Sequence, residues 1–177
     1  PPVMQPVILS NTDVPNDQGR QVRIRWERCD HDAPNQPFVI TGYAVYRYQG
    51  DFARLHRPDA TVGRGRGITI DGWDYITTVP ARGDEIYQVV APTLCDTPKN
   101  GDPCYSVFFV SAMTPDPLEF FDSAPDTGES IDNLPPGPPG ALLVEAAELG
   151  IAVSWRAPGD EDVVQYLIYR SDGSASF

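Results

Sequence analysis

Cationic and metal-binding side chains are scarce in this sequence. Only one of its 13 basic residues is a lysine, Lys99, and 25 acidic residues leave a formal net charge of −12. An acidic surface repels phosphate backbones, so the charge excludes nucleic acid as an expected partner. The two histidines, His31 and His56, both lie in stretches that we predict to be loops.

Long hydrophobic runs and catalytic motifs are absent as well. No apolar run approaches the roughly 18 residues that a membrane span requires. We find no Gly-x-Ser-x-Gly, no His-Glu-x-x-His and no Gly-rich phosphate loop between a strand and a helix. No signal peptide is recognisable, and the chain begins at Pro1, as expected of a processed or excised segment. The sequence therefore predicts neither an enzyme nor a membrane span.

Proline and glycine, by contrast, are abundant, with 19 and 15 residues, and they separate short apolar runs. Within residues 20–28 the side chains of Val22, Ile24 and Trp26 point one way, and the arginines between them point the other. This period of two is typical of a half-buried β-strand. No segment carries a convincing 3.6-residue apolar stripe over three turns, so we predict an all-β protein.

One motif occurs twice in the chain. Residues 22–26 are followed by the Tyr-x-Val-Tyr-Arg run 43–47, and residues 151–155 are followed by the similar run 166–170. Further strand-like segments follow the first copy, but only seven residues follow the second. The repeat therefore predicts one whole β-domain and the first three strands of another, the third of them at 164–169.

These patterns resemble fibronectin type III repeats. The resemblance rests on a Pro-rich entry, the Trp strand, the Tyr-Arg strand and a late Tyr-containing strand at 105–112. It implies two tandem immunoglobulin-like β-sandwiches, the second incomplete in this chain. The parts are a domain at 1–133 with a long 50–71 insertion, a stiff Pro/Gly linker at 134–140 and the N-terminal part of a second domain at 141–177. In the late strand, the alternation from Tyr105 to Val110 fits the family pattern only with a bulge.

Several shorter runs look like tandem β-sandwich modules of large secreted proteins of environmental bacteria. These runs are residues 13–19, 72–75, 78–81 and 120–126. The resemblance implies a spacer, stalk or interaction module, located outside the cell or at its surface, within a larger assembly such as a filament or array. It implies protein partners, either other domains of the same protein or neighbouring copies, and it implies no catalysis.

The three cysteines bear on the cellular compartment. Cys95 and Cys104 flank a stretch made almost wholly of turn-forming residues. Two strands joined by such a loop would bring the thiols together, so we expect a disulfide and an extracytoplasmic location. Cys29 is left over, and we interpret it as a buried or idle thiol.

Acidic residues near the predicted domain junction form a candidate metal site. Calcium takes about six to eight oxygen ligands from carboxylates, amides and backbone carbonyls, and a junction can supply them from both sides. The candidate ligands are Asp122, Asp126, Asp132, Asn133, Asp160 and Asp162. No fixed-spacing calcium motif is present, and the alternative is a solvated acidic loop that keeps the protein soluble. We expect no other cofactor.

Apolar residues of the second domain are the main candidates for partner contact. Three strands leave open backbone edges and half of a core exposed. Either the natural chain continues and covers this surface, or strands of a neighbouring molecule cover it. The candidate interaction residues are Ile151, Val153 and Ile168, together with Phe120 and Phe121 of the first domain. One of the two phenylalanines must face outward if their strand is regular.

The sequence thus predicts a non-catalytic structural or interaction module. Two alternatives remain open: an accessory or carbohydrate-binding module of a secreted hydrolase, and an adhesin that uses the tripeptide Arg82-Gly83-Asp84. An exposed aromatic row would favour sugar binding, whereas we expect Trp26, Tyr43, Trp155 and Tyr166 in the cores. The tripeptide also has a plain interpretation as a turn between two strands.

Overall fold

The computed structural model describes residues 5–36, 39–50, 70–98, 101–160 and 163–171. It is an all-β structure, and its backbone contacts divide the chain into two compact units, Pro1–Asn133 and Leu134–Phe177. Most of the insertion predicted at 50–71 lies outside the described residues. None of the described residues forms a helix long and apolar enough to cross a membrane.

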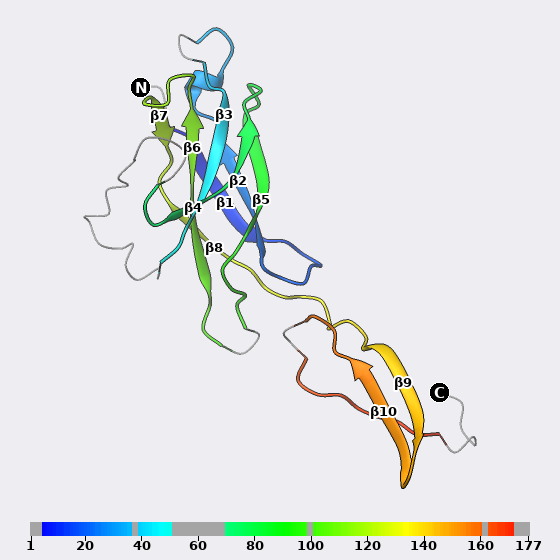
Figure 1. Cartoon of the computed structure of the whole chain (residues 1–177). Coiled ribbons are helices and arrows are strands. Elements are labelled where there is room, and N and C mark those ends of the chain that lie inside the picture. The colour runs from blue at the N-terminus through cyan, green and yellow to red at the C-terminus, as the bar shows by residue number, and fades with distance from the viewer. Residues whose placement is uncertain (1–4, 37–38, 51–69, 99–100, 161–162, 172–177) are drawn as a thin grey trace. The chain divides into compact units, whose positions relative to one another are not determined.

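The first unit contains two antiparallel sheets (Figure 1). One has the order β1-β2-β5, and the other has the order β4-β3-β6-β7, with β8 also paired to β6. The strands are β1 (Val7–Asp13), β2 (Gln21–Glu27), β3 (Gly42–Tyr48), β4 (Trp73–Pro80), β5 (Ile86–Pro92), β6 (Tyr105–Met113), β7 (Phe120–Asp122) and β8 (Asp126–Glu129). A short 3-10 turn, η1 (Asp30–Asp32), follows β2.

A single hydrophobic core joins the two sheets. The predicted inward face of β2 is fully buried, since Val22, Ile24 and Trp26 have no exposed surface. The core side chains of the three-stranded sheet come from β2 and β5, and those of the five-stranded sheet come from β3 and β6. Trp26 stacks on Tyr87 of β5 with ring centroids 5.8 Å apart, and Tyr43 of β3 lies 5.8 Å from the same tryptophan. The period-two alternation therefore identified the buried face of β2 correctly.

Strand β6 is buried on both faces. Its ladder with β3 keeps one register from Phe108 to Met113, and its ladder with β8 keeps one register from Tyr105 to Phe108, so the bulge that the family pattern would require near Tyr105 is not present. Phe108 and Val110 belong to the core between the sheets. On the other face Phe109 stacks on Tyr46 at 4.8 Å, within a second buried cluster. Because both faces are apolar, the strand shows no single in-and-out pattern.

The second unit contains a two-stranded antiparallel sheet, formed by β9 (Gly140–Ala147) and β10 (Gly150–Arg156). The strand predicted at 164–169 is not formed, since no strand is assigned to the described residues 163–171. The reason is that a strand needs neighbouring backbone to bond. The matching strand β3 pairs with β4 and β6, whereas residues 163–171 pair with no other described segment in a β-ladder.

Candidate functional site

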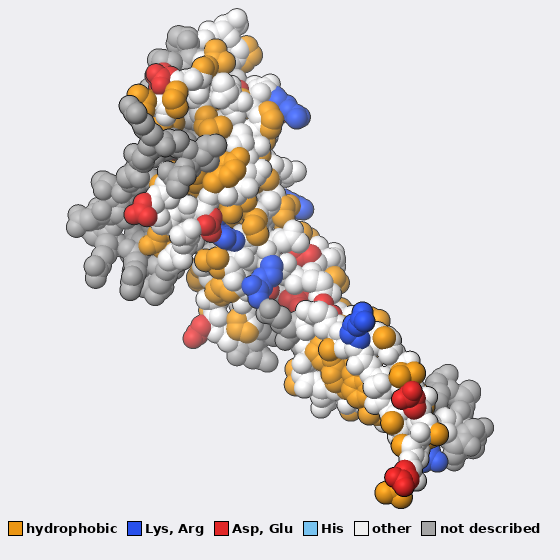
Figure 2. Space-filling view, in the orientation of Figure 1, with side chains coloured by type: hydrophobic (Ala, Val, Ile, Leu, Met, Phe, Trp, Pro, Cys, Tyr) orange, Lys and Arg blue, Asp and Glu red, His pale blue; other side chains and the backbone are white. Residues whose placement is uncertain are grey.

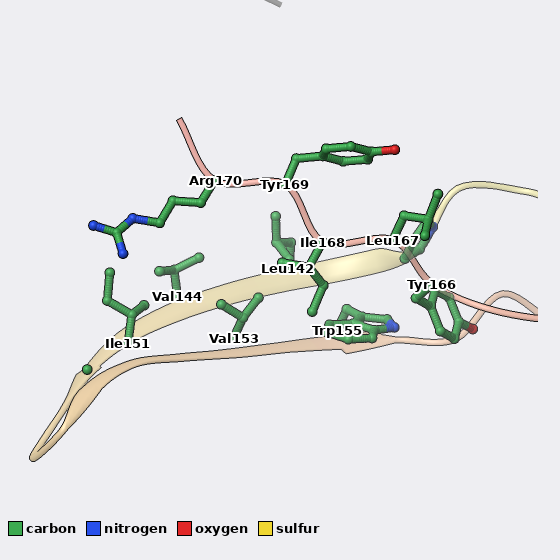
Figure 3. A pocket seen from close by; sticks show the side chains of 12 residues that line it. Leu142, Val144, Ile151, Val153, Trp155, Tyr166, Leu167, Ile168, Tyr169 and Arg170 are labelled. Atoms are coloured by element: carbon green, nitrogen blue, oxygen red, sulfur yellow. The ribbon is translucent and has the colours of Figure 1, made fainter. Parts of the chain in front are cut away.

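An open apolar groove in the second unit is the main candidate site. Its volume is about 860 Å³. β9, β10 and the extended segment 166–170 form its walls (Figure 3). The lining residues used below are Leu142, Val144, Ile151, Val153, Trp155 and Ile168. Three of the predicted interaction residues therefore lie in one groove: Ile151 and Val153 of β10, and Ile168 of the extended segment.

The side chains of the extended segment alternate across the groove. Figure 3 shows Tyr166 and Ile168 directed toward β10, whereas Leu167 and Tyr169 are directed away from it. Trp155 and Tyr166 touch, with ring centroids 5.1 Å apart and planes inclined by 59°. This is the same tryptophan–tyrosine contact that Trp26 and Tyr43 make in the first unit.

The groove differs from the first core in its exposure to solvent. Ile151 and Ile168 are 63% and 65% exposed, and Tyr166 is 38% exposed. The matching residues of the first unit, Val22, Val45 and Tyr43, have no exposed surface. The expectation that Trp155 and Tyr166 are core residues was therefore wrong within this chain, since Trp155 is only half-buried and Tyr166 is exposed.

Strand β9 contributes groove residues that the sequence analysis did not single out. Leu142 and Val144 line the groove and are 67% and 57% exposed. Val144 lies opposite Val153 in the β9–β10 ladder, so both residues share one face of the sheet. The signal in the sequence was the alternation of Leu142, Val144 and Ala146. Figure 2 shows hydrophobic side chains gathered on the visible face of this unit.

The predicted calcium ligands of the first unit have partners within the protein. Asp126 accepts a hydrogen bond from Asn11 Nδ2 at 3.2 Å. The side chain of Asn133 accepts one from the backbone N–H of Asp17 at 3.1 Å and donates one to Asp13 Oδ2 at 2.8 Å. These bonds attach the end of the first unit to β1 and to the loop that follows it.

Of the remaining candidate ligands, Asp122 and Asp132 belong to the first unit and Asp160 to the second. Asp122 ends β7 opposite Ser111, and Asp160 accepts a hydrogen bond from the backbone N–H of Gly137 at 2.7 Å. Asp132 is half-buried after β8, and Asp162 lies outside the described residues. Across the part of the chain that is described, no three His, Cys, Asp or Glu side chains form a group able to hold a metal ion. Calcium therefore stays a prediction from the sequence.

The predicted disulfide is present. Cys95 and Cys104 are bonded, with their Cα atoms 6.1 Å apart. The loop that they close is also held by Thr97, whose hydroxyl accepts a hydrogen bond from the backbone N–H of Cys104 at 3.0 Å and donates one to Glu129 at 3.1 Å. Cys29 is a free thiol and is fully buried. This agrees with its interpretation as a buried thiol.

A partly buried hydrogen-bond network beside the first core was not foreseen from the sequence. The Asp32 carboxylate accepts hydrogen bonds from the hydroxyls of Tyr43, at 2.9 Å, and Tyr87, at 2.7 Å. It also accepts the backbone N–H of Gly83 at 3.2 Å. Asp32 lies in a polar loop, and its partners are far away in sequence, so no local pattern marks it.

This network holds the Arg82-Gly83-Asp84 tripeptide as a turn. The Tyr87 hydroxyl accepts the backbone N–H groups of Arg82 and Asp84 at 2.7 and 3.2 Å. Gly83 has a φ of +75°, a conformation that favours glycine. The side chains of Arg82 and Asp84 are exposed. The plain interpretation of the tripeptide as a turn between two strands, β4 and β5, is therefore confirmed.

Burial shifts the titration of the groups in this network. Desolvation, then the nearby Cys29 and the bond to Asp32, raise the pKa of Tyr43 far above its ordinary value. Desolvation and the bond to Asp32 likewise raise the pKa of Tyr87, and desolvation raises the pKa of the Cys29 thiol. All three groups are thus held in their neutral forms, which is the opposite of what an activated nucleophile needs.

The phenylalanine pair of β7 does not form an exposed edge. Phe120 and Phe121 are both half-buried. Phe121 packs against the core of the first unit and lies 5.2 Å from the ring of His31. The role of the pair in partner contact stays a prediction.

The chain matches no protein-family model, and no curated protein matches its sequence.

Proposed function

We propose that this chain is a non-catalytic structural and interaction module of a secreted or cell-surface bacterial protein, built from fibronectin type III-like sandwiches. The order of strands supports the sandwich. A three-stranded sheet β1-β2-β5 and a second sheet centred on β3 and β6 share one core, as the resemblance implies. The second unit repeats the motif of β2 and β3 and is the N-terminal part of a second sandwich.

The observation that carries the proposal is the contrast between the two copies of the motif. The first copy closes a core by itself, because β5 and β6 cover β2 and β3. The second copy exposes the matching side chains, including Ile151 and Ile168. A large exposed apolar surface on a folded unit marks a place where other polypeptide binds. We therefore assign the interaction role to the second unit and the spacer role to the first.

The disulfide supports a location outside the cytoplasm. Disulfides persist in oxidising compartments and are rare where glutathione and thioredoxin keep thiols reduced. Cys95 and Cys104 are bonded, and the loop between them has the turn composition of a surface segment. The acidic surface fits a soluble extracellular assembly.

A localisation experiment with a redox readout tests this proposal. Cells that naturally produce the protein are fractionated, and free thiols are blocked with an alkylating reagent before analysis. We expect the protein outside the cell or at its surface, with Cys95 and Cys104 oxidised and Cys29 alkylated only after denaturation, each cysteine being identified from its own proteolytic peptide. A cytoplasmic protein in which these three cysteines are reduced would contradict the proposal.

Adhesion through Arg82-Gly83-Asp84 is the second candidate, because the turn holds its backbone inward and leaves both charged side chains exposed. Its test is attachment of integrin-bearing cells to the immobilised protein. Attachment that Asp84→Glu abolishes would support adhesion, and equal attachment to both proteins would exclude it.

A further inference from the structure

We propose that the disulfide between Cys95 and Cys104 is a redox-sensitive latch that holds the last residues of the first unit, 129–133, in place. Reduction of the disulfide by a dithiol releases these residues and so lengthens the free chain that leads to β9. The inference goes beyond the proposed function, because it rests only on contacts within the first unit.

The disulfide lies where separate segments of the first unit meet. Cys104 directly precedes β6, whose first residue lies opposite Glu129 at the end of β8. Asp96 and Thr97 directly follow Cys95 and belong to no strand. Both of these residues bond to other segments, so the disulfide fixes the position of two side chains that no β-ladder holds.

Thr97 connects the disulfide to the end of the unit. Its backbone N–H donates a hydrogen bond to the carbonyl of Ser130 at 2.7 Å. Its hydroxyl donates to the Glu129 carboxylate at 3.1 Å and accepts the backbone N–H of Cys104 at 3.0 Å. Because Cys104 is one half of the disulfide, this hydroxyl joins the bridge directly to the end of β8.

Ser130 is the buried anchor of residues 129–133. It has no exposed surface, and its hydroxyl accepts the backbone N–H of Gln21 at 3.0 Å. Its carbonyl accepts the N–H of Thr97. A buried backbone carbonyl needs a donor. If Thr97 moves away, water can replace that donor only when Ser130 leaves its buried position.

The other bonds of residues 129–133 are exposed to solvent. Asp13 accepts the backbone N–H of Ile131 at 2.9 Å and the side-chain amide of Asn133 at 2.8 Å. Water competes for such bonds, so each adds little to the hold on the segment. The pair formed by Thr97 and Ser130 therefore decides whether the segment stays in place.

Asp96 extends the latch to the turn between β1 and β2. Its carboxylate accepts the backbone N–H of Arg20 and forms an ion pair with Nε of the same residue at 3.3 Å. Arg20 has a φ of +62°, which residues other than glycine adopt rarely. The contact with Asp96 supports this conformation, so opening the disulfide loosens the turn as well.

The disulfide can be reached by a reductant without opening the core. Cys95 and Cys104 are only half-buried, whereas Cys29 is fully buried. In the exchange, a thiolate of the dithiol attacks one sulfur and forms a mixed disulfide, which its second thiol then resolves. The protein gains two thiols, and the dithiol supplies the two electrons and two protons and becomes a cyclic disulfide.

The test is limited proteolysis of the 177-residue protein by a Glu-specific protease, before and after reduction with dithiothreitol. Cleavage after Glu129 requires its segment to leave its place, whereas Glu145 of β9 is exposed and gives a reference rate in the same digest. We expect reduction to speed cleavage after Glu129, relative to Glu145, by about tenfold or more. An unchanged ratio of the two rates would overturn the proposal.

Pulsed alkylation in the same samples distinguishes a local release from unfolding of the whole unit. We expect Cys95 and Cys104 to react in the reduced protein while Cys29 stays protected, each cysteine being identified from its own peptide. If Cys29 reacts as fast as the other two, reduction unfolds the entire unit, and a local latch is excluded.

Two variants test the role of Thr97 while the disulfide stays intact. Thr97→Val removes the hydroxyl bonds to Glu129 and Cys104, and it should speed cleavage after Glu129 in the oxidised protein, though less than reduction does. Thr12→Val makes the same change at an exposed position of β1 and should leave the rate unchanged. Equal rates of cleavage in the two variants would overturn the proposal.

Discussion

The two matching tryptophans provide a paired test of the difference between the units. Trp26 has no exposed surface and contacts Tyr43 and Tyr87. Trp155 is half-buried and lies against Tyr166, which is itself exposed. We expect Trp26→Ala to lower the free energy of unfolding of the first unit by about 3–5 kcal/mol, because truncating a buried aromatic side chain removes contacts and leaves a cavity.

The matched variant Trp155→Ala should change the unfolding of the first unit by less than about 0.5 kcal/mol, the range of substitutions away from a core. A domain of this type is stable by about 5–15 kcal/mol, so the loss expected for Trp26→Ala is a large share of the total. If that variant does not fold, Trp26→Phe keeps a ring in the core and should show a smaller loss in the same direction.

Cys29 supplies an assay that reports on the first unit alone. It is fully buried, and it is the one thiol left free by the disulfide. Pulsed alkylation of this thiol across a urea series therefore measures the unfolding midpoint of the first unit, whatever the second unit does. The reasoning is refuted if Trp26→Ala costs less than about 1 kcal/mol, or if Trp155→Ala shifts the Cys29 midpoint equally.

Three further predictions concern the first unit. Replacing Cys95 and Cys104 together by Ser should lower the free energy of unfolding by about 2–3 kcal/mol, as estimated for a loop of this size, and reductant added to the native protein should have the same effect in urea titrations; no change would contradict it. The pKa of Tyr43 is raised in the folded state, so the unfolded chain loses this proton first. The contribution of Tyr43 to the free energy of unfolding should therefore be constant below about pH 10. Above that pH it should fall by about 1.4 kcal/mol per pH unit. Tyr43→Phe should remove this contribution to the pH dependence. Urea titrations between pH 8 and 11 measure it, and an equal fall of the free energy of unfolding with pH in the variant and the original protein would contradict the role of Tyr43 in the network. Asp32→Ala should cost about 1–3 kcal/mol, because two buried hydroxyls lose their acceptor, and it should speed tryptic cleavage after Arg82, whereas Asp84→Ala should not. Equal cleavage rates in the two variants would exclude the role of Asp32 in holding the turn.

Local patterns in the sequence were sufficient where one strand face is apolar and the other polar. The alternation of Val22, Ile24 and Trp26 identified both the strand and its buried face, because a period of two has one geometric meaning. The turn-rich stretch between Cys95 and Cys104 likewise predicted the disulfide, because a short loop that joins two strands holds the thiols at its two ends close together.

Other features depend on partners that are distant in sequence. Residues 164–169 have a strand pattern but form no strand, since strand formation requires a neighbour and not only a propensity. The two-sided burial of β6 depends on a second cluster around Tyr46 and Trp73. Asp32 became important through Tyr43 and Tyr87, which the fold brings to it. None of these contacts has a local sequence signal.

The central claim is that the second unit presents, uncovered, the surface that the first unit buries. Solvent paramagnetic relaxation measured on methyl groups tests it most directly, with an inert gadolinium complex added to the 177-residue protein. We predict strong relaxation enhancement at the methyls of Ile168 and Ile151 and almost none at those of Val45 and Val22. Equal protection of the two pairs in the monomer would contradict the claim.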